Sequence, residues 1–184
     1  MLDPLILKTV SVGLAAMFFV AGYHKFADAA QFRVTLLEYQ VLPEVLVAPT
    51  SRIIPIIELL LGGAWLLSYY QAGLTAIASA GLLGIYAVAI TINILRGRVH
   101  FDCGCGFGGK TENEQYLSGG LVLRNVVLIV LALLTMLPSG TRDLGIGDYL
   151  TLAAALLATA MLFAAANQLL ANRAAINTWR KRSD

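Results

Sequence analysis

Five long apolar stretches, separated by short polar connections, set the pattern of this chain. A helix needs about 20 mainly apolar residues to cross the hydrocarbon core of a membrane. The stretches that reach or approach this length lie at about residues 5–23, 53–70, 72–95, 121–137 and 149–170. The pattern therefore predicts an all-α integral membrane protein, with a four-helix transmembrane bundle followed by a fifth transmembrane helix.

A more polar segment follows the first apolar stretch. Its apolar residues recur at helical spacing with charged residues between them, which is typical of an amphipathic helix at the membrane surface. These apolar positions are Phe32, Leu36, Leu37 and Val41. Pro43 and Pro49 are expected to end this interfacial helix before the second span begins.

Composition agrees with a single membrane domain over residues 1–184. The 184 residues are 58% hydrophobic and 13% charged, and the mean hydropathy is +0.76. Soluble domains carry about 25% charged residues. No linker or low-complexity tract divides the chain. The basic C-terminal tail is interpreted as a topology signal, and no nucleic-acid partner is expected.

Alternating spans bring the unusual polar residues to one end of the predicted bundle. The end of the first span, the start of the second, the end of the third and the start of the fourth share a membrane face. Nearly every ionisable residue in or beside a span belongs to this end. The polar residues there are Tyr23, His24, Lys25, Arg52, Glu58, Asn93, Arg96, Arg98, Cys103, Cys105, Arg124 and Asn125.

Glu58 lies well inside the second span. A carboxylate at that depth is costly, and it normally faces the protein interior with a cationic partner. Lys25, Arg96 and Arg124 are the candidate partners. Two interpretations stay open: an ion pair that fixes helix register, or a group with a functional duty.

Cys103 and Cys105 are the only cysteines, and one glycine separates them in a glycine-rich loop at residues 99–116. A disulfide this short closes almost no loop, so it adds little stability. Strained, exposed disulfides are the oxidising and labile ones, and nearby cations favour the reactive thiolate. The pair therefore predicts thiol–disulfide chemistry. The candidate cations are Arg96, Arg98, Lys110 and Arg124.

Two other interpretations of the cysteine loop remain. His100, Asp102 and the two thiols are possible ligands for a soft metal such as Zn or Cu(I). Zinc sites, however, usually combine two pairs of ligands, and the chain has no second cysteine pair. The remaining interpretation is a loop with two incidental thiols.

Several motifs together resemble the MauE family of methylamine-utilisation membrane proteins, within the larger DoxX-like group. The resemblance extends from the first span through the fourth. Its most specific part is Asn93-Ile94-Leu95-Arg96-Gly97-Arg98 followed by Asp102-Cys103-Gly104-Cys105. The other motifs are Gly22-Tyr23-His24-Lys25, Tyr39-Gln40-Val41-Leu42-Pro43, Pro55-Ile56-Ile57-Glu58 and Arg124-Asn125. This chain departs from the family pattern by one inserted residue, Gly106.

The resemblance implies a role in the maturation of methylamine dehydrogenase, whose small subunit is rich in disulfides. It implies a multi-pass protein of the bacterial inner membrane that acts with a MauD-like thioredoxin-fold partner. Cys103 and Cys105 would carry the exchange, with Lys25, Glu58, Asn93, Arg96, Arg98 and Arg124 in support. No cofactor is certain, although analogy with membrane thiol oxidoreductases suggests a quinone as electron acceptor. A non-catalytic assembly factor is the alternative.

The charge distribution and the implied client favour opposite membrane faces for the cysteines. Every lysine and arginine except Lys8 and Arg142 falls on the cysteine side of the predicted bundle. The positive-inside rule then places that side in the cytoplasm. Disulfides of the implied client, by contrast, persist in an oxidising compartment such as the periplasm.

Overall fold

The computed structural model describes residues 3–67, 72–97, 119–140, 142, 144–162 and 165. Within these residues the chain is helical and has no strand. Its helices are α1 (Pro4–Ala27), α2 (Ala29–Tyr39), α3 (Glu44–Leu67), α4 (Ala72–Leu95) and α5 (Gly119–Leu134). A further helix, Ile146–Leu162, is called the C-terminal helix. The predicted all-α class is thus confirmed.

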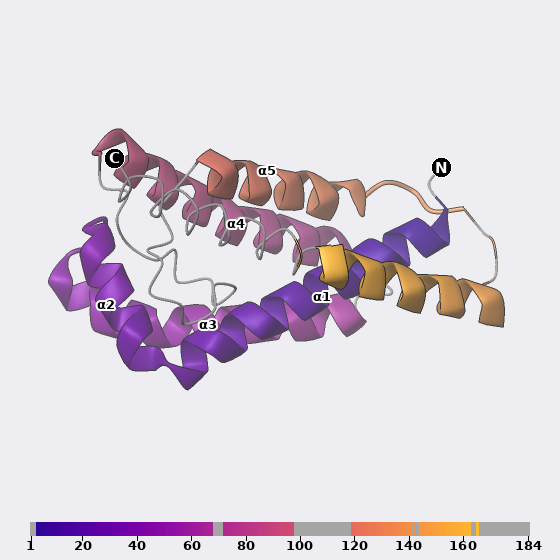
Figure 1. Cartoon of the computed structure of the whole chain (residues 1–184), viewed down its shortest axis with the longest axis horizontal. Coiled ribbons are helices and arrows are strands. Elements are labelled where there is room, and N and C mark those ends of the chain that lie inside the picture. Colours follow the sequence, from indigo (N-terminus) through magenta and orange to yellow (C-terminus); the bar gives the residue numbers. More distant parts are fainter. Residues whose placement is uncertain are drawn as a thin grey trace, which may run out of the picture.

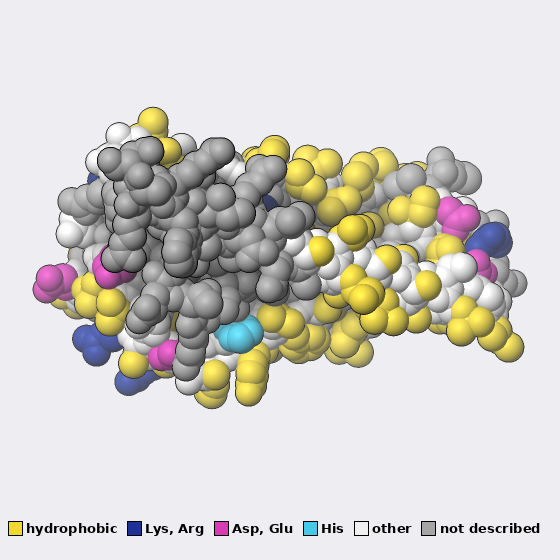
Figure 2. Space-filling model, in the orientation of Figure 1, with side chains coloured by type: hydrophobic (Ala, Val, Ile, Leu, Met, Phe, Trp, Pro, Cys, Tyr) yellow, Lys and Arg dark blue, Asp and Glu magenta, His cyan; other side chains and the backbone are white. Residues whose placement is uncertain are grey.

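Three helices are long and apolar enough to cross a membrane. These are α1, α3 and α4, while α5 and the C-terminal helix are apolar but shorter. Charged side chains on the face in Figure 2 lie mostly toward the two ends, and hydrophobic side chains cover much of the visible described surface between them. The chain therefore has the surface of a membrane protein, and the five-span count stays a prediction.

One apolar core joins four of the helices. It takes Leu14, Ala15 and Phe18 from α1, Leu61 and Trp65 from α3, Ala76 and Leu83 from α4, and Ala132 from α5. Successive long helices run in opposite directions, with α1 beside α3 and α4 beside α5 (Figure 1). The end of α1 and the end of α4 consequently lie toward one end of the molecule, as the alternating spans predict.

Asp28 separates α1 from α2 and turns the chain between them. Its backbone N–H donates to His24 O at 3.0 Å, which closes α1. Its side chain accepts a hydrogen bond from Gln31 N at 3.2 Å, which caps the start of α2. One residue therefore ends the first long helix and begins the helix expected at the membrane surface.

The apolar residues predicted for the amphipathic helix divide between buried and exposed positions. Phe32, Thr35 and Tyr39 are buried, whereas Leu37 and Val41 are each 40% exposed. The helix ends at Tyr39 because Gln40 adopts the left-handed conformation, so Val41 lies outside the helical repeat. Spacing alone did not identify which apolar residues face the other helices.

Pro49 does not end a helix, contrary to expectation. It lies inside α3, as does Pro55, and α3 begins at Glu44. A proline removes one backbone donor and bends a helix without necessarily ending it. Pro43 does lie in the connection between α2 and α3.

Glycines set the closest approach between α1 and α3. A Cβ atom on Gly22 would lie 3.0 Å from Leu59 Cγ and 3.1 Å from the carbonyl oxygen of Pro55. A Cβ on Gly62 would lie 3.1 Å from the ring of Phe19. Small residues thus permit close packing of α1 against α3.

Trp65 links α3 to α4 through the core. It is 3% exposed, and its indole Nε1–H donates to Ser79 Oγ at 2.9 Å. The structure therefore places this side chain in the protein interior. A buried indole with a satisfied N–H fixes the relation between the two helices.

Replacing Gly22 with alanine should destabilise the protein. The added methyl group would press on the backbone of α3, and overpacking of this kind costs about 1–3 kcal/mol. Thermal unfolding of the purified protein in detergent measures the change. Gly63→Ala is the control, because nothing lies within 4 Å of a Cβ at Gly63. Equal stability of the two variants would contradict the close packing described here.

Candidate functional site

A buried ion pair joins α1 to α3. The Lys25 ammonium, in the last turn of α1, bonds directly to Glu58 Oε1 in α3. Lys25 is 5% exposed and Glu58 is 1% exposed. Among the three candidate partners for Glu58, the structure therefore selects Lys25.

The close approach at Gly22 explains how this pair forms. A Cβ on Gly22 would lie 3.2 Å from Glu58 Cβ, so the two helix backbones nearly touch at this level. Lys25 lies three residues further along α1, on the same face of the helix. Its long side chain then reaches back across the narrow gap to the carboxylate.

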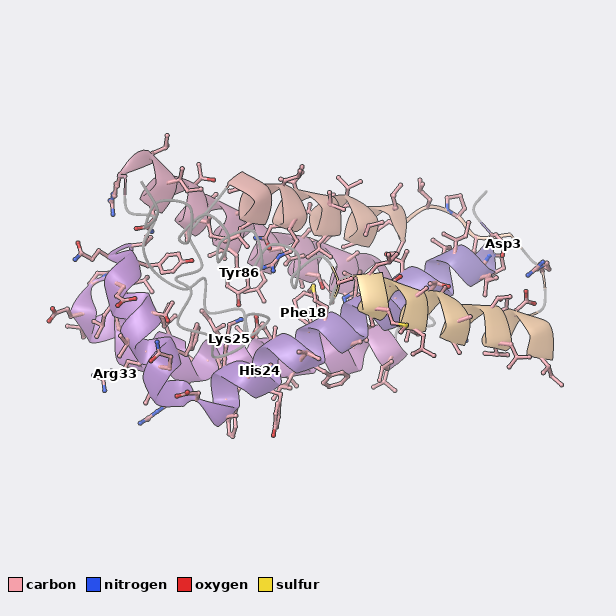
Figure 3. All side chains as sticks on the ribbon, in the orientation of Figure 1. Asp3, Phe18, His24, Lys25, Arg33 and Tyr86 are labelled. Atoms are coloured by element: carbon pink, nitrogen blue, oxygen red, sulfur yellow. The ribbon has the colours of Figure 1, made fainter. Side chains whose placement is uncertain are left out.

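Tyr86 of α4 completes the cluster. Its hydroxyl donates to Glu58 Oε1 at 2.7 Å, and Lys25 Nζ lies 4.9 Å from the centre of its ring. Lys25 Nζ also lies 5.5 Å from the ring of Phe32 in α2. Figure 3 shows Lys25 and Tyr86 approaching each other from α1 and α4. Residues of four helices thus surround one ammonium group, and we call Lys25, Glu58 and Tyr86 the interior cluster.

The sequence analysis did not identify Tyr86. One signal was available: Tyr86 lies in the middle of the apolar stretch at residues 72–95. Tyrosines that anchor a helix at the membrane surface lie near its ends. A phenol at mid-span needs a hydrogen-bond partner, and the carboxylate at Glu58 supplies it.

The carboxylate of Glu58 is bonded asymmetrically. Both Lys25 and Tyr86 bond to Oε1, while the buried Oε2 accepts no hydrogen bond within the described part of the chain. Charged pairs removed from water are stable only with good geometry and further hydrogen bonds. Lys25 and Tyr86 supply two hydrogen bonds to the carboxylate, and the rings of Phe32 and Tyr86 lie beside the ammonium group.

Two buried asparagines belong to the same end of the molecule. Asn93 Nδ2 donates to Ala89 O, and Asn125 Nδ2 donates to Leu121 O, each at 3.0 Å within its own helix. Both side chains are buried. The buried Oδ1 of Asn93 has no hydrogen-bond partner among the described residues.

Helix register places the start of α5 beside the interior cluster. Ile90 of α4 packs in one apolar group with Leu121 and Val122 of α5. Because α4 and α5 run antiparallel, a step of four residues from Ile90 toward the start of α4 and a step of four residues from Leu121 toward the end of α5 reach the same height along the bundle. Asn125 therefore lies at about the level of Tyr86, and Arg124, which is half-buried, lies beside it.

Arg96 is separate from the interior cluster. It is exposed, and its Nη1 donates to the carbonyl oxygen of Gln40 at 3.1 Å. This contact joins the end of α4 to the end of α2. Arg96 thus supports the fold at the same end of the molecule through a different contact.

Comparison with known proteins identifies the family. The family model "Methylamine utilisation protein MauE" matches residues 3–138. This chain belongs to the MauE family. No solved structure matches it.

Individual MauE proteins agree with this assignment. The methylamine utilization protein MauE of Paracoccus versutus is 34% identical over 151 residues, which cover 79% of each chain. The MauE protein of Paracoccus denitrificans is 32% identical over 133 residues, covering 72% of this chain and 69% of its own. That of Methylophilus methylotrophus is 33% identical over 103 residues, covering 56% and 54%.

The MauE match includes every residue of the predicted site and ends before the C-terminal helix. Several of the predicted residues, however, lie outside the described part of the chain. These are Arg98, His100, Asp102, Cys103 and Cys105, with the rest of the loop at residues 99–116. Across the described residues, no group of three or more His, Cys, Asp or Glu side chains is arranged to hold a metal. The redox role of the two thiols stays a prediction.

Replacing Glu58 with glutamine should destabilise this MauE protein strongly. The variant leaves the buried Lys25 ammonium without its counter-charge, and breaking one partner of a buried pair costs about 3–5 kcal/mol. Denaturation of the purified protein measures the loss. Glu38→Gln is the control, because Glu38 is an exposed acid on α2. If both variants were as stable as the unmodified protein, the Lys25–Glu58 pair would contribute nothing to the stability of the fold.

Replacing Tyr86 with phenylalanine should have a smaller effect in the same direction. The ring beside Lys25 is retained, and only the hydroxyl that donates to Glu58 is lost. A hydrogen bond to a charged group contributes about 1.5–3 kcal/mol. The same denaturation assay should rank Tyr86→Phe between the unmodified protein and Glu58→Gln. A loss as large as that of Glu58→Gln would contradict this division of roles.

Proposed function

We propose that this chain is a membrane thiol–disulfide redox component that supports disulfide formation in the small subunit of methylamine dehydrogenase. The observation that carries the proposal is the Cys103-Gly104-Cys105 pair, the only cysteines of a MauE-family chain. The names of the relatives connect the family with methylamine utilization. A dithiol without structural use in a membrane protein is suited to exchange reactions.

The proposed reaction has two stages, disulfide exchange with the client and reoxidation of the dithiol. A client thiolate attacks one sulfur of the Cys103–Cys105 disulfide, which breaks the S–S bond and forms a mixed disulfide. A second client thiolate displaces the cysteine, so the client gains a disulfide and Cys103 and Cys105 become thiols. Reoxidation then releases two electrons and two protons to an acceptor, for which analogy suggests a membrane quinone. A MauD-like thioredoxin-fold protein is the proposed intermediary to the client.

The interior cluster has a supporting role in this proposal. The Lys25–Glu58 pair and Tyr86 tie α1, α3 and α4 together. The segment with the two cysteines joins the end of α4 to the start of α5, where Arg124 lies. A cation near a thiol favours its thiolate form, and Arg124 is the residue proposed for this task.

Replacing both cysteines with serine should abolish maturation without removing the protein from the membrane. The measured quantities are the amount of correctly disulfide-bonded small subunit and the amount of this protein in membranes. Ser118→Ala, in the same connecting segment, is the control. Full maturation in the Cys103→Ser/Cys105→Ser variant would refute the redox function and leave a non-catalytic assembly factor as the function.

Direct exchange with a periplasmic client requires the thiols to face the periplasm. A membrane-impermeant maleimide should then label Cys103 and Cys105 in intact cells of the bacterium. The distribution of lysines and arginines gives the opposite expectation, so the result separates the two arguments. Labelling only after permeabilisation would contradict direct exchange with a periplasmic client.

A further inference from the structure

The interior cluster lies where two pairs of helices meet. α1 packs mainly against α3, and α4 packs mainly against α5, with fewer contacts between the two pairs. Figure 1 shows α4 and α5 along one side of the molecule and α1 and α3 along the other. Lys25 and Glu58 come from α1 and α3, and Tyr86 comes from α4. Ligand sites in helical bundles are built from side chains of facing helices, and the cluster has this arrangement.

The cluster contains a hydrogen-bond acceptor and a hydrogen-bond donor with capacity for a further partner. Glu58 Oε2 is buried and accepts no hydrogen bond from the residues that the structure describes. A buried acceptor without a donor costs free energy. The Lys25 ammonium has three N–H groups, and Glu58 Oε1 takes one of them. A molecule that donates to a carboxylate and accepts from an ammonium therefore matches these two groups.

The charge balance of the cluster favours a neutral ligand. Lys25 and Glu58 neutralise each other, and both side chains are buried. An added ion would leave one uncompensated charge inside the membrane, which is costly. A metal cation or a charged amine is therefore a poor match. The rings of Phe32 and Tyr86 beside the ammonium supply apolar surface for the body of the ligand.

The α4 side of the cluster is open to a ligand dissolved in the membrane. Tyr86 is half-buried, and its neighbours on the same helix, Ile85 and Val88, are exposed. α4 is long and apolar enough to cross a membrane, so exposed aliphatic side chains near its middle face the hydrocarbon. The ligand expected here is thus neutral, soluble in lipid and able to form hydrogen bonds.

We propose that the interior cluster binds the headgroup of a membrane quinone. Glu58 Oε2 accepts a hydrogen bond from a hydroxyl of the reduced form, the quinol. Lys25 donates one of its other N–H groups to an oxygen of the same ring. When bound, the quinone supplies an acceptor for two electrons and two protons. The choice of a quinone among neutral ligands rests on the proposed function, whereas the site itself rests on the geometry of the cluster.

Equilibrium binding of a short-chain, water-soluble ubiquinol to the purified full-length protein tests this proposal. Isothermal titration calorimetry in detergent, without oxygen, should show saturable binding. Glu58→Gln removes the charge of the acceptor and should weaken the affinity at least tenfold, about the effect of losing one hydrogen bond to a charged group. Ser51→Ala is the control, because this buried hydroxyl of α3 donates within its own helix, to Ala48 O at 2.9 Å. Its affinity should be unchanged.

A double variant separates binding from stability. Replacing a buried ion pair with apolar residues of similar volume often leaves a protein as stable as before. Lys25→Met/Glu58→Leu should therefore fold and lose saturable binding of the ubiquinol. Should Glu58→Gln fail to fold, the double variant decides alone. Equal affinity in the double variant and the unmodified protein would overturn the proposal, as would the lack of saturable binding to the unmodified protein.

The same assay distinguishes failure of this site from failure of the proposed function. The quinol site requires neither thiol, so Cys103→Ser/Cys105→Ser should bind the ubiquinol as tightly as the unmodified protein does. If maturation proceeded without the cysteines while the cluster bound the quinol, the redox function would be refuted and the site would stand. If maturation required both cysteines but the cluster bound no quinol, only the site would be refuted.

Discussion

The buried Lys25–Glu58 ion pair is the interaction on which the arrangement of this end of the molecule depends. A carboxylate that is 1% exposed inside a helical membrane protein needs a cation in direct contact. That need fixes the rotation of α1 against α3, because Lys25 must face Glu58. It also explains the glycine at position 22, since a side chain there would press against α3 near Glu58. Tyr86 then brings α4 to the same carboxylate oxygen.

The packing around this pair divides into two levels. Toward the start of α1, Phe18, Leu61, Trp65 and their neighbours form an apolar core shared by α1, α3, α4 and α5. Toward the end of α4, Tyr39 of α2 and Ile90 of α4 form a second apolar group, against which the first turns of α5 pack. The cysteine-bearing segment connects two helices that are held at both levels.

Hydropathy was sufficient to predict the helical class and the approximate regions of the long helices, although α3 begins at Glu44, before the start predicted for the second span. It also limited the partner of Glu58 to three cations, but could not choose among them. The choice depends on helix rotation and on the close approach at Gly22, which are properties of tertiary packing. The same limit explains why the role of Tyr86 was not predicted and why spacing did not show which apolar residues of α2 pack against the other helices. Pro49 was misjudged because proline often bends a helix that neighbouring helices stabilise.

The most direct test of the account is the redox state of Cys103 and Cys105 in living cells. Cells producing methylamine dehydrogenase are quenched with acid, free thiols are alkylated, and the connecting segment is analysed by mass spectrometry. The account predicts a Cys103–Cys105 disulfide in part of the population, with the oxidised fraction increasing when the client is absent. A pair that is fully reduced in both conditions, or that carries stoichiometric metal, would contradict it.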